Sequence, residues 1–365
     1  MTAAEPTGDP NEREPISYEE LALAARNHGM PLEGLRYDIT PVGMHYLLIH
    51  FDIPAADAET WSIDVGGLVE RPFTLSVADL RSRPAVTMPV TLECAGNGRA
   101  RLNPRPLSQP WLDEAVGTGA WTGTPLGPIL EAAGLGPTAT EIVFRGADHG
   151  MQGDVEQDYE RSLSIADAMR DDVLLAYELN GRSLPPQHGF PVRLLVPGWY
   201  GMTSVKWLRS ITAVVESFEG YQMWAYRLRQ DEEDEGTPVT RMVPRALMIP
   251  PGFPEFFTRS RTLDAGPVTL EGRAWSGWGS VVRVEVSVDG GASWSDAQLS
   301  EPVGAYAWRH WTQRWTAEAG THELLVRATD ETGRVQPTEQ PWNHHGLSNN
   351  LVQRISVVVR SSAAD

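Results

Sequence analysis

The chain contains a single cysteine, Cys94, within the stretch TLECAGNGRA at residues 91–100. The residues that follow it, Ala-Gly-Asn-Gly, have the composition of a loop and not of a core strand. Residues 95–110 carry three arginines and no acid, although the whole chain has a formal net charge of −18. Cationic surroundings favour the thiolate form of a cysteine, and a thiolate acts as a nucleophile or as a ligand of a soft metal.

Three interpretations of Cys94 follow from the residues alone. A free cysteine in a folded protein is most often a small apolar core residue. As a nucleophile it would need a base, and nine histidines are present, but no local signature of a cysteine hydrolase surrounds it. As a metal ligand it would need partners, and the chain has no C-x-x-C or H-E-x-x-H motif. The ligand interpretation therefore requires a metal completed from elsewhere, for example by an organic cofactor.

Length and composition narrow the class of protein. A chain of 365 residues is long enough for two domains, and an apolar fraction of 41% with 13 tryptophans is typical of a folded protein. The net charge of −18 argues against nucleic acid or an anionic membrane as a partner. No run of about 18 apolar residues is present, so no membrane span is predicted. One cysteine excludes an intrachain disulfide and the polar start lacks an export signal, so we expect a cytoplasmic protein.

The local pattern changes at residues 231–235, a run of five acids that we interpret as a solvated linker or loop. Before this run, short apolar segments separated by glycine and proline indicate α+β structure. Strands are predicted at 61–69 and 191–198. A short helix is predicted within 164–172, with Ser164 as its N-cap.

Residues 260–361 are dominated by alternating strand patterns. In VVRVEVSVDGGASW, residues 281–294, the alternate valines from Val282 to Val288 are predicted to share one face, and Asp-Gly-Gly supplies a hairpin turn. We interpret this region as an antiparallel β-sandwich of immunoglobulin-like build. The predicted boundaries are a disordered lead over 1–18, a catalytic domain over 19–238 and the sandwich domain over 239–361.

Several segments resemble the sulfite oxidase family of molybdopterin-dependent oxidoreductases, in its bacterial form without a haem domain. VTLECAGNGR is similar to the molybdenum-cysteine loop of that family, and RNHGMP (26–31) resembles an early family segment. Further similar segments follow in the family's order: PW and AVGTGAWTGTPL within 110–126, FRGAD (144–148), LLAYELNGRSLPPQHGFPVRLLVPGWYG (174–201), VKWL (205–208), AYAWRHW (305–311) and WNHHGLSNN (342–350). The resemblance covers roughly residues 20–361.

The resemblance implies a molybdenum bound by the Cys94 thiolate and by one molybdopterin, which accounts for the shortage of protein ligands. It implies an α+β fold class, with a sulfite oxidase-type molybdopterin-binding domain followed by an immunoglobulin-like β-sandwich dimerisation domain, and therefore a homodimer. Arg193 and Lys206 suit the cofactor phosphate, since arginine binds phosphate bidentately and lysine acts as a point charge. The cofactor-binding roles that the resemblance implies fall on Arg26, Asn27, His28, Asp148, His188, Arg193, Ser204 and Lys206.

The resemblance also implies a sulfite pocket made of three arginines, a tryptophan and a tyrosine near the metal. Matched segment by segment, these catalytic roles fall on Arg26, Arg99, Arg309, Trp111 and Tyr226. The implied reaction is the oxidation of sulfite to sulfate by oxygen-atom transfer, and the arginine and tyrosine of the later segments favour sulfite over nitrate. No haem motif is present, so we expect electrons to pass to an external acceptor such as a cytochrome c.

Two positions depart from the family pattern. Gly98 stands where the family loop often has an arginine, and Ala225 stands where an aspartate is frequent, while residues 240–261 match no family segment. These departures keep open a molybdoenzyme of the same fold that acts on nitrate, a sulfoxide or another sulfur compound. An alternative of a different class is a metal-free β-sandwich binding module, in which Trp111 would be an ordinary core residue.

Overall fold

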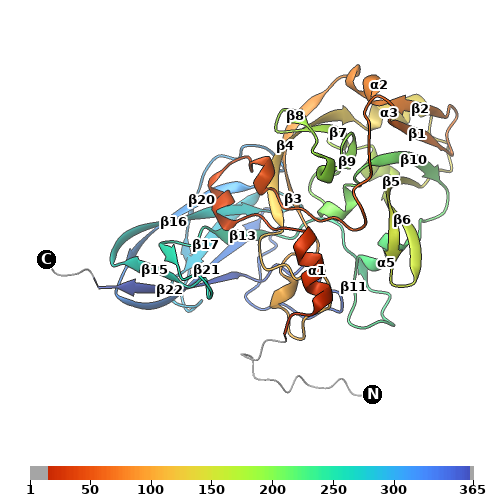
Figure 1. The fold of residues 1–365 in the computed structure, drawn as a ribbon. Coiled ribbons are helices and arrows are strands. Elements are labelled where there is room, and N and C mark those ends of the chain that lie inside the picture. Colours follow the sequence, from red (N-terminus) through yellow and green to blue (C-terminus); the bar gives the residue numbers. More distant parts are fainter. Residues whose placement is uncertain (1–14, 362–365) are drawn as a thin grey trace.

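A computed structural model describes residues 15–361 and contains a mixed, strand-rich N-terminal domain followed by a β-sandwich that ends near the C-terminus (Figure 1). Residues 1–14 of the predicted disordered lead lie outside the described residues. The predicted end of that lead at residue 18 is too late, because helix α1 (Tyr18–Arg26) is already capped by Ser17. The cap is a capping box with Glu20. None of the helices within the described residues has the length and apolar character needed to span a bilayer.

Two sheets form the frame of the N-terminal domain, and apolar side chains such as Phe144 and Trp207 are fully buried in its main core. The first sheet has the order β2-β1-β10-β5-β6, with β1 Ser62–Gly67, β2 Phe73–Ser76, β5 Glu141–Gln152, β6 Val155–Ser164 and β10 Leu208–Val214. The second has the order β3-β4-β7-β8 with β9 paired to β7, and comprises β3 Val86–Glu93, β4 Val116–Pro125, β7 Leu174–Leu179, β8 Arg182–Ser183 and β9 Arg193–Leu195.

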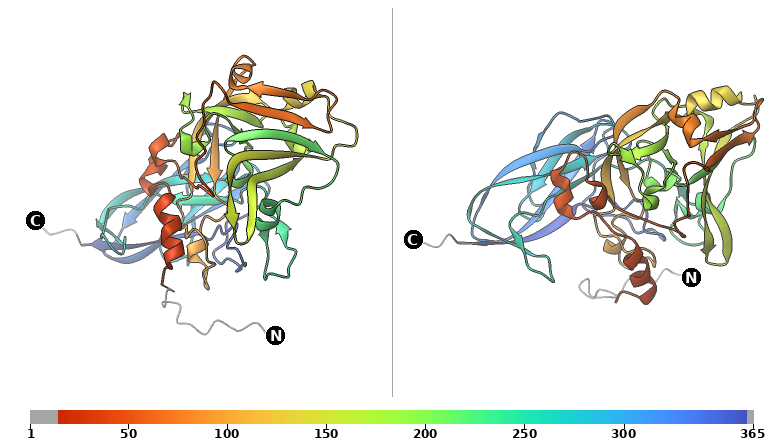
Figure 2. Two further views of the ribbon diagram at one scale, coloured as in Figure 1. Left: turned by 45° about the vertical axis from the view of Figure 1, so that its right-hand side comes forward. Right: turned by 45° about the horizontal axis from the view of Figure 1, so that its top comes forward.

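Short helices and 3-10 turns occur along the same domain, and Figure 2 shows it from two further sides. They are α2 Val77–Arg81, α3 Gly127–Ala133, α4 Ile165–Ala168 and α5 Tyr221–Ala225, with 3-10 turns η1 Leu32–Arg36, η2 Val42–Met44, η3 Arg99–Arg101, η4 Pro186–His188 and η5 Gly201–Thr203. The predicted strands at 61–69 and 191–198 contain β1 and β9. The predicted capped helix is α4, where the Ser164 hydroxyl accepts the Asp167 N–H at 3.0 Å.

The C-terminal sandwich packs two sheets around a core that includes Trp311, Leu324 and Val357. One sheet has the order β13-β16-β20-β19, with β13 Arg245–Met248, β16 Gly266–Trp275, β19 Gln298–Leu299 and β20 Arg309–Ala317. The other has the order β14-β15-β22-β21-β17-β18, with β14 Phe253–Pro254, β15 Arg261–Asp264, β17 Val281–Ser287, β18 Ser295–Asp296, β21 Gly320–Asp330 and β22 Gln353–Arg360.

The first strand of the sandwich is β13, which begins at Arg245, within the predicted domain of 239–361 and before the strand-rich region at 260–361. Two other details of the predicted sandwich need correction. The sandwich is not purely antiparallel, because β15 and β22 run parallel. Val282 is 53% exposed, because the register shifts between Val281 and Arg283 and turns Val281 inward instead.

The acidic run at 231–235 lies in the loop of a small hairpin between β11 (Arg227–Leu228) and β12 (Thr237–Pro238). Asp234 accepts hydrogen bonds from the Gln230 and Gly236 N–H groups, so the acids shape a loop at the surface. This confirms that the run does not pack into a core.

A buried ion network joins the two domains beneath the loop that carries the cysteine. Arg245 of β13 is 1% exposed, and its guanidinium pairs with Glu93 at 3.0 Å and with Asp113 at 3.1 Å. Glu93, the last residue of β3, also accepts the indole N–H of Trp275 at 2.8 Å. Arg101 completes the network by pairing with Asp113. Two buried acids are thus matched by two arginines, which removes the cost of an unpaired buried charge.

Replacing Arg245 by methionine should destabilise the chain strongly, because two buried carboxylates would lose a common partner. We expect the free energy of unfolding to fall by about 3–5 kcal/mol. Arg360→Met is the matched control, since its ion pair with Asp264 has side chains 54% and 65% exposed. It should cost less than about 1 kcal/mol. Urea unfolding followed by tryptophan fluorescence measures both, and equal losses would contradict this role of the network.

Candidate active site

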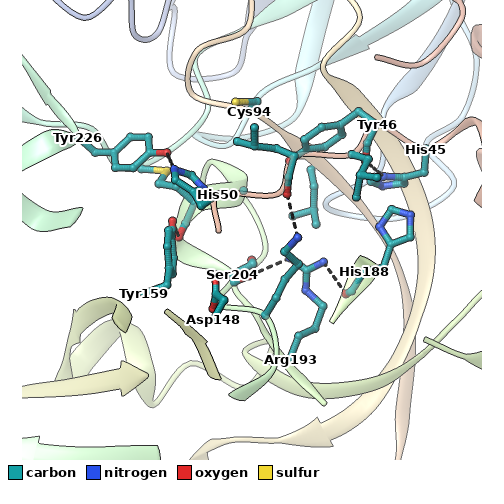
Figure 3. A pocket seen from close by; sticks show the side chains of 16 residues that line it. His45, Tyr46, His50, Cys94, Asp148, Tyr159, His188, Arg193, Ser204 and Tyr226 are labelled. Carbon is teal, nitrogen blue, oxygen red and sulfur yellow. Dashed lines mark hydrogen bonds between the residues drawn. The ribbon is translucent and has the colours of Figure 1, made fainter. Parts of the chain in front are cut away.

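Cys94 follows β3 directly and forms part of the wall of a cavity (Figure 3). The residue is 7% exposed and packs against Trp111 and Ala115. Its carbonyl accepts the Asn97 N–H at 2.9 Å, which closes the turn after the strand. Burial raises the pKa of the Cys94 thiol, and the charge of Arg99 only partly opposes this. A bound metal cation would supply the charge that a buried thiolate needs.

The basic stretch seen in the sequence does not surround the thiol as a whole. Arg101 pairs with Asp113, and Arg105 pairs with Glu20 at 2.7 Å, so both charges are compensated away from the cysteine. Arg99 alone of the three acts on the thiol. The basic stretch therefore favours the thiolate less than its composition indicates, because tertiary ion pairs use two of its arginines.

The cavity beside Cys94 has about 630 Å³ of space not filled by protein atoms. Figure 3 shows side chains from segments far apart in the chain converging on it. One wall comes from residues 45–50 and another from the 188–206 region, and Asp148 lies beside Ser204. The polar side chains that line it are His45, Tyr46, His50, Cys94, Asp148, Tyr159, His188, Arg193, Ser204, Lys206 and Tyr226.

Two cations are held in this cavity by backbone carbonyl groups. The Arg193 guanidinium donates to the His188 carbonyl at 3.1 Å and to the Ser204 carbonyl at 2.8 Å. The Lys206 ammonium donates to the Leu48 carbonyl at 2.8 Å. Burial lowers the pKa of Arg193 to about 10 and also lowers the pKa of Lys206. Arg193 keeps its charge at neutral pH, and an anion beside Lys206 would favour the charged form of the lysine, so this end of the cavity suits a phosphate.

Several buried polar atoms in and beside the cavity have no hydrogen-bond partner among residues 15–361. They are His45 Nε2, Asp148 Oδ1, Arg193 Nε and Thr203 Oγ1. Burial raises the pKa of Asp148, which favours a protonated carboxyl that can donate as well as accept. Unsatisfied buried groups are costly, so their concentration here indicates a polar ligand. The residues present fit molybdopterin, which carries hydrogen-bonding groups and a phosphate.

The metal would depend on this organic ligand. Among the described residues, no group of three or more histidine, cysteine, aspartate or glutamate side chains is arranged to hold a metal ion. Cys94 therefore offers one soft sulfur ligand, and a metal bound there would take its other ligands from the cofactor. This agrees with the ligand interpretation of the cysteine.

Gly98, the predicted departure from the family loop, has a structural reason. Its φ is +88°, and a Cβ at this position would lie 2.7 Å from the Asn349 carbonyl oxygen and 3.3 Å from Arg245. The Asn349 side chain donates to the Gly98 carbonyl at 2.7 Å. The C-terminal domain thus packs directly on the cysteine loop, and only glycine fits without strain.

A second cavity adjoins the first, and we call it the channel. His50 and Tyr226 line both, and they touch through a contact of 3.2 Å between the Tyr226 hydroxyl and His50 Nε2. The channel has about 1190 Å³ of space not filled by protein atoms. Arg99 lines it, with Nε donating to the His345 carbonyl at 2.8 Å and Nη1 to the Gln109 carbonyl at 3.0 Å. Arg99 Nη2 has no partner in the described part of the chain.

The structure brings most of the predicted site residues together. Arg99 lines the channel and Trp111 packs on Cys94. The predicted residues that line the first cavity are Cys94, Asp148, His188, Arg193, Ser204, Lys206 and Tyr226.

The structure places the predicted residues of the RNH segment outside both cavities. Arg26 ends α1, donates to the Phe51 carbonyl at 2.6 Å and is 3.6 Å from Asp52. The Asn27 side chain accepts the Ile49 N–H at 2.7 Å, and His28 is exposed and pairs through its backbone with the following segment. Residues 26–28 therefore pair with residues 45–50 and do not line the cavity.

Arg309 also lies away from both cavities. It begins β20, and its guanidinium donates to the Ser300 carbonyl at 2.6 Å and the Val281 carbonyl at 2.9 Å, within the sandwich. The arginine that sequence matching assigned to the substrate pocket thus lines neither cavity and binds two carbonyl groups of the sandwich. Sequence matching placed it there because AYAWRHW (305–311) resembles a family segment.

Sequence reasoning missed the segment HYLLIH at 45–50, which supplies His45, Tyr46 and His50. The only signal was a pair of histidines at the ends of an apolar run. The segment reaches the cavity because its backbone pairs with His28, with N–H to carbonyl distances of 2.8 and 3.1 Å. Tyr159 was also missed, since nothing in its strand marks it.

Comparisons with known proteins agree with this site. Residues 50–222 match the oxidoreductase molybdopterin binding domain, and residues 250–360 match the Mo-co oxidoreductase dimerisation domain. Mitochondrial sulfite oxidase of Rattus norvegicus is 34% identical over 377 residues, which cover 96% of this chain and 68% of that protein. Nitrate reductase [NAD(P)H] of Hordeum vulgare is 35% identical over 352 residues, which cover 88% of this chain and 39% of that protein.

A solved structure supports the fold over nearly the whole chain. The sulfane dehydrogenase SoxCD from Paracoccus pantotrophus superposes with a TM-score of 0.79 at 25% identity, covering 96% of this chain and 92% of that one. Fold and site together define a molybdenum-dependent oxidoreductase built on a molybdopterin-binding domain. The chain belongs to the sulfite oxidase family of molybdopterin-dependent oxidoreductases.

Gly98→Ala should lower the free energy of unfolding by more than the left-handed backbone conformation alone explains. The matched control is Gly333→Ala, because Gly333 has φ +83° and no atom within 4 Å of an added Cβ. The control should lose only the left-handed strain of about 1–2 kcal/mol. Gly98→Ala should lose about 1–3 kcal/mol more through the clash with Asn349, and should retain less molybdenum. Equal losses in urea unfolding, with equal molybdenum content, would contradict this packing.

The pH dependence of stability should reveal the buried, neutral His45. Burial lowers its pKa to about 4, so below pH 6.5 the unfolded chain takes up a proton that the folded chain does not. Stability is therefore lost as the pH falls. The stability of cofactor-free His45→Gln relative to wild type should rise by about 1.4 kcal/mol per pH unit from 6.5 towards 4. Above pH 7.5 the difference should be constant, and a constant difference at all pH values would contradict the assignment.

Proposed function

We propose that this protein oxidises sulfite to sulfate and passes the electrons to an external acceptor such as a cytochrome c. The observation that carries the proposal is the position of Arg99. Its buried guanidinium lies between the cysteine loop and the channel, acts electrostatically on Cys94, and keeps Nη2 without a protein partner. A small anion that reached the end of the channel would meet this donor first.

The protein's own residues would bind and orient the anion. Arg99 donates a charge-assisted hydrogen bond from Nη2 to a sulfite oxygen and thereby offsets the negative net charge of the chain locally. Gly96 makes this possible, because a Cβ there would lie 2.5 Å from Nη2 of Arg99. The molybdenum cofactor, when bound by Cys94, supplies the oxygen-atom transfer and takes up the two electrons.

Tyr226 and His50 would form a donor–acceptor pair of hydrogen-bonding groups where the cavity meets the channel. Burial raises the pKa of the Tyr226 hydroxyl, so this group stays protonated and can donate. Burial lowers the pKa of His50 to about 4, so the imidazole is neutral near pH 7 and can accept the tyrosine hydrogen bond. A bound anion would compete with His50 for the hydrogen bond that the Tyr226 hydroxyl donates. Together these groups give the substrate oxygens one neutral donor beside the charged one.

The assembly is also part of the proposal. Residues 19–238 would act as the catalytic domain and residues 239–361 as the dimerisation domain of a homodimer. The match of residues 250–360 to a dimerisation domain supports this assignment. Arg245 belongs to the proposed second domain and holds the cysteine loop of the first, so the two would act as one unit.

A second candidate function is the oxidation of a larger sulfur compound. Two observations favour it. Of the three predicted pocket arginines, only Arg99 lines a cavity among the described residues, and the channel is much larger than a sulfite ion. The structural relative carries the name sulfane dehydrogenase, which is consistent with a different sulfur substrate. The similarity to plant nitrate reductases keeps nitrate as a further alternative.

Arg99→Met should reduce kcat/KM for sulfite by about 10- to 150-fold, because one charge-assisted hydrogen bond is lost. Arg309→Met is the control and should leave kcat/KM within about 3-fold, since Arg309 binds only carbonyl groups of the sandwich. Sulfite-dependent reduction of ferricyanide, normalised to molybdenum content, measures both variants. Unchanged turnover in Arg99→Met would overturn the proposed site, and no sulfite turnover by molybdenum-loaded wild type would overturn the substrate.

A further inference from the structure

A groove lined by acidic side chains lies next to the channel, and we call it the acidic groove. It has about 1280 Å³ of space not filled by protein atoms and is formed largely by residues 217–219, helix α5 and the hairpin β11–β12. Six carboxylates line it against two guanidinium groups, and the acids are Glu141, Glu219, Glu232, Glu233, Asp234 and Glu235. The groove therefore concentrates part of the net charge of −18 on one surface.

The carboxylates of the acidic groove are of two kinds. Asp234 accepts backbone N–H groups within its own loop, and Glu141 accepts the Phe218 N–H at 3.1 Å, so these two shape the surface. The other four are exposed and have no side-chain hydrogen bond or ion pair among residues 15–361; they are Glu219, Glu232, Glu233 and Glu235. The fold does not use these four charges, which leaves them free to attract a partner.

The acidic groove also contains a buried cation with an unused donor. Arg229 lines the groove and is 3% exposed, and its Nε has no hydrogen-bond partner in the described part of the chain. Its guanidinium carbon lies 4.3 Å from the centre of the Trp224 ring. A buried donor without a partner is costly, so this one indicates an acceptor atom that a ligand brings. The groove therefore suits a partner that is cationic at its rim and carries a hydrogen-bond acceptor near its centre.

Trp224 connects the acidic groove with the rest of the site. Its side chain lines both the groove and the channel and is 47% exposed. Its ring lies 6.1 Å, between centroids, from that of His345, and the His345 carbonyl accepts Arg99 Nε at 2.8 Å. Tyr226, two residues after Trp224, lines the cavity beside Cys94. A partner in the groove would therefore touch a side chain whose contacts continue to the cysteine loop.

We propose that the acidic groove is the docking surface for the electron acceptor, and that this acceptor is a small redox protein with lysines around the exposed edge of its cofactor. The inference rests on the proposed function, because it requires an external acceptor. Opposite charges would steer such a partner to the groove, and the exposed Trp224 ring would be the apolar centre of the contact. Redox complexes are weak and their interfaces small, so a single groove provides enough surface.

The electron balance requires two docking events for each turnover. One sulfite and one water give one sulfate, two protons and two electrons. Two acceptor proteins would dock in turn and take one electron each, while the protons pass to water. Fast exchange of acceptors is then needed, and attraction between exposed charges provides it because it raises the association rate without a tight complex.

The test titrates the molybdenum-loaded enzyme with a cytochrome c of positive net charge at an ionic strength of about 10 mM. The groove variant combines Glu232→Gln, Glu233→Gln and Glu235→Gln, and so removes three charges that make no hydrogen bond in the described chain. We expect its Kd for the cytochrome to rise about 10-fold and kcat/KM for sulfite-dependent cytochrome reduction to fall by a similar factor. Turnover of sulfite with ferricyanide, a small anion, should not fall.

The matched control variant combines Glu59→Gln, Glu301→Gln and Glu318→Gln, which removes the same charge at exposed positions outside the groove. Its Kd and its kcat/KM for the cytochrome should stay within about 2-fold of wild type. A cytochrome c with acetylated lysines should bind wild type at least about 10-fold more weakly, because acetylation removes the charges that the groove would attract. Raising the ionic strength to about 0.2 M should weaken binding more in wild type than in the groove variant.

The outcomes separate this inference from the proposed function. If the groove variant binds the cytochrome as tightly as the control variant, or if wild type oxidises sulfite with ferricyanide but binds no cytochrome, the docking surface is overturned. If cytochrome binding weakens as expected but wild type does not oxidise sulfite with ferricyanide, the surface stands and the proposed substrate fails. Molybdenum content and the urea midpoint show whether the groove variant is folded. If it is not, the single charge reversal Glu233→Lys decides through the same comparison of Kd.

Discussion

The buried ion network around Arg245 is the interaction on which the rest of the site depends. Glu93 is the residue immediately before Cys94, and both of its carboxylate oxygens are used by side chains of the C-terminal domain. A buried carboxylate without these partners would be strongly destabilising. The position of the cysteine is therefore fixed from one side by its own strand and from the other by the second domain. The packing of Asn349 on Gly98 continues the same contact along the loop.

This arrangement explains why the site lies where the two domains meet. The cofactor cavity belongs to the N-terminal domain and gathers its cations, Arg193 and Lys206, from one region of the chain. The channel, which shares His50 and Tyr226 with the cavity, is lined from both domains, with Arg99 from the cysteine loop and His345 from the C-terminal loop. Burial favours the neutral forms of His45, His50, His188 and the Cys94 thiol. A charged ligand would change this balance. In the proposed function, the channel residues bind the substrate and the cofactor supplies the redox chemistry.

Much of the fold could be predicted from local patterns. The Gly/Pro-punctuated apolar runs gave the mixed N-terminal domain, and the acidic run at 231–235 marked a surface loop. Alternation predicted the sandwich strands, and the error at Val282 arose because a β-bulge shifts the register by one residue. The parallel pairing of β15 with β22 could not be read from the sequence, since alternation does not report the direction of a partner strand.

For the site, the sequence by itself determined the residues that sit in dense, ordered motifs. Cys94 and the 188–206 region carry their chemistry on loops whose composition is distinctive, and they do line the cavity. Only the tertiary structure decided which segments, and which of their residues, face the cavity. The pairing of His28 with Leu47 turns the 45–50 segment inward and leaves the RNH segment outside. Packing of the 342–350 loop brings His344 and His345 to the channel, whereas Arg309 lies within the sandwich. Such contacts join residues tens or hundreds of positions apart, and local spacing does not encode them.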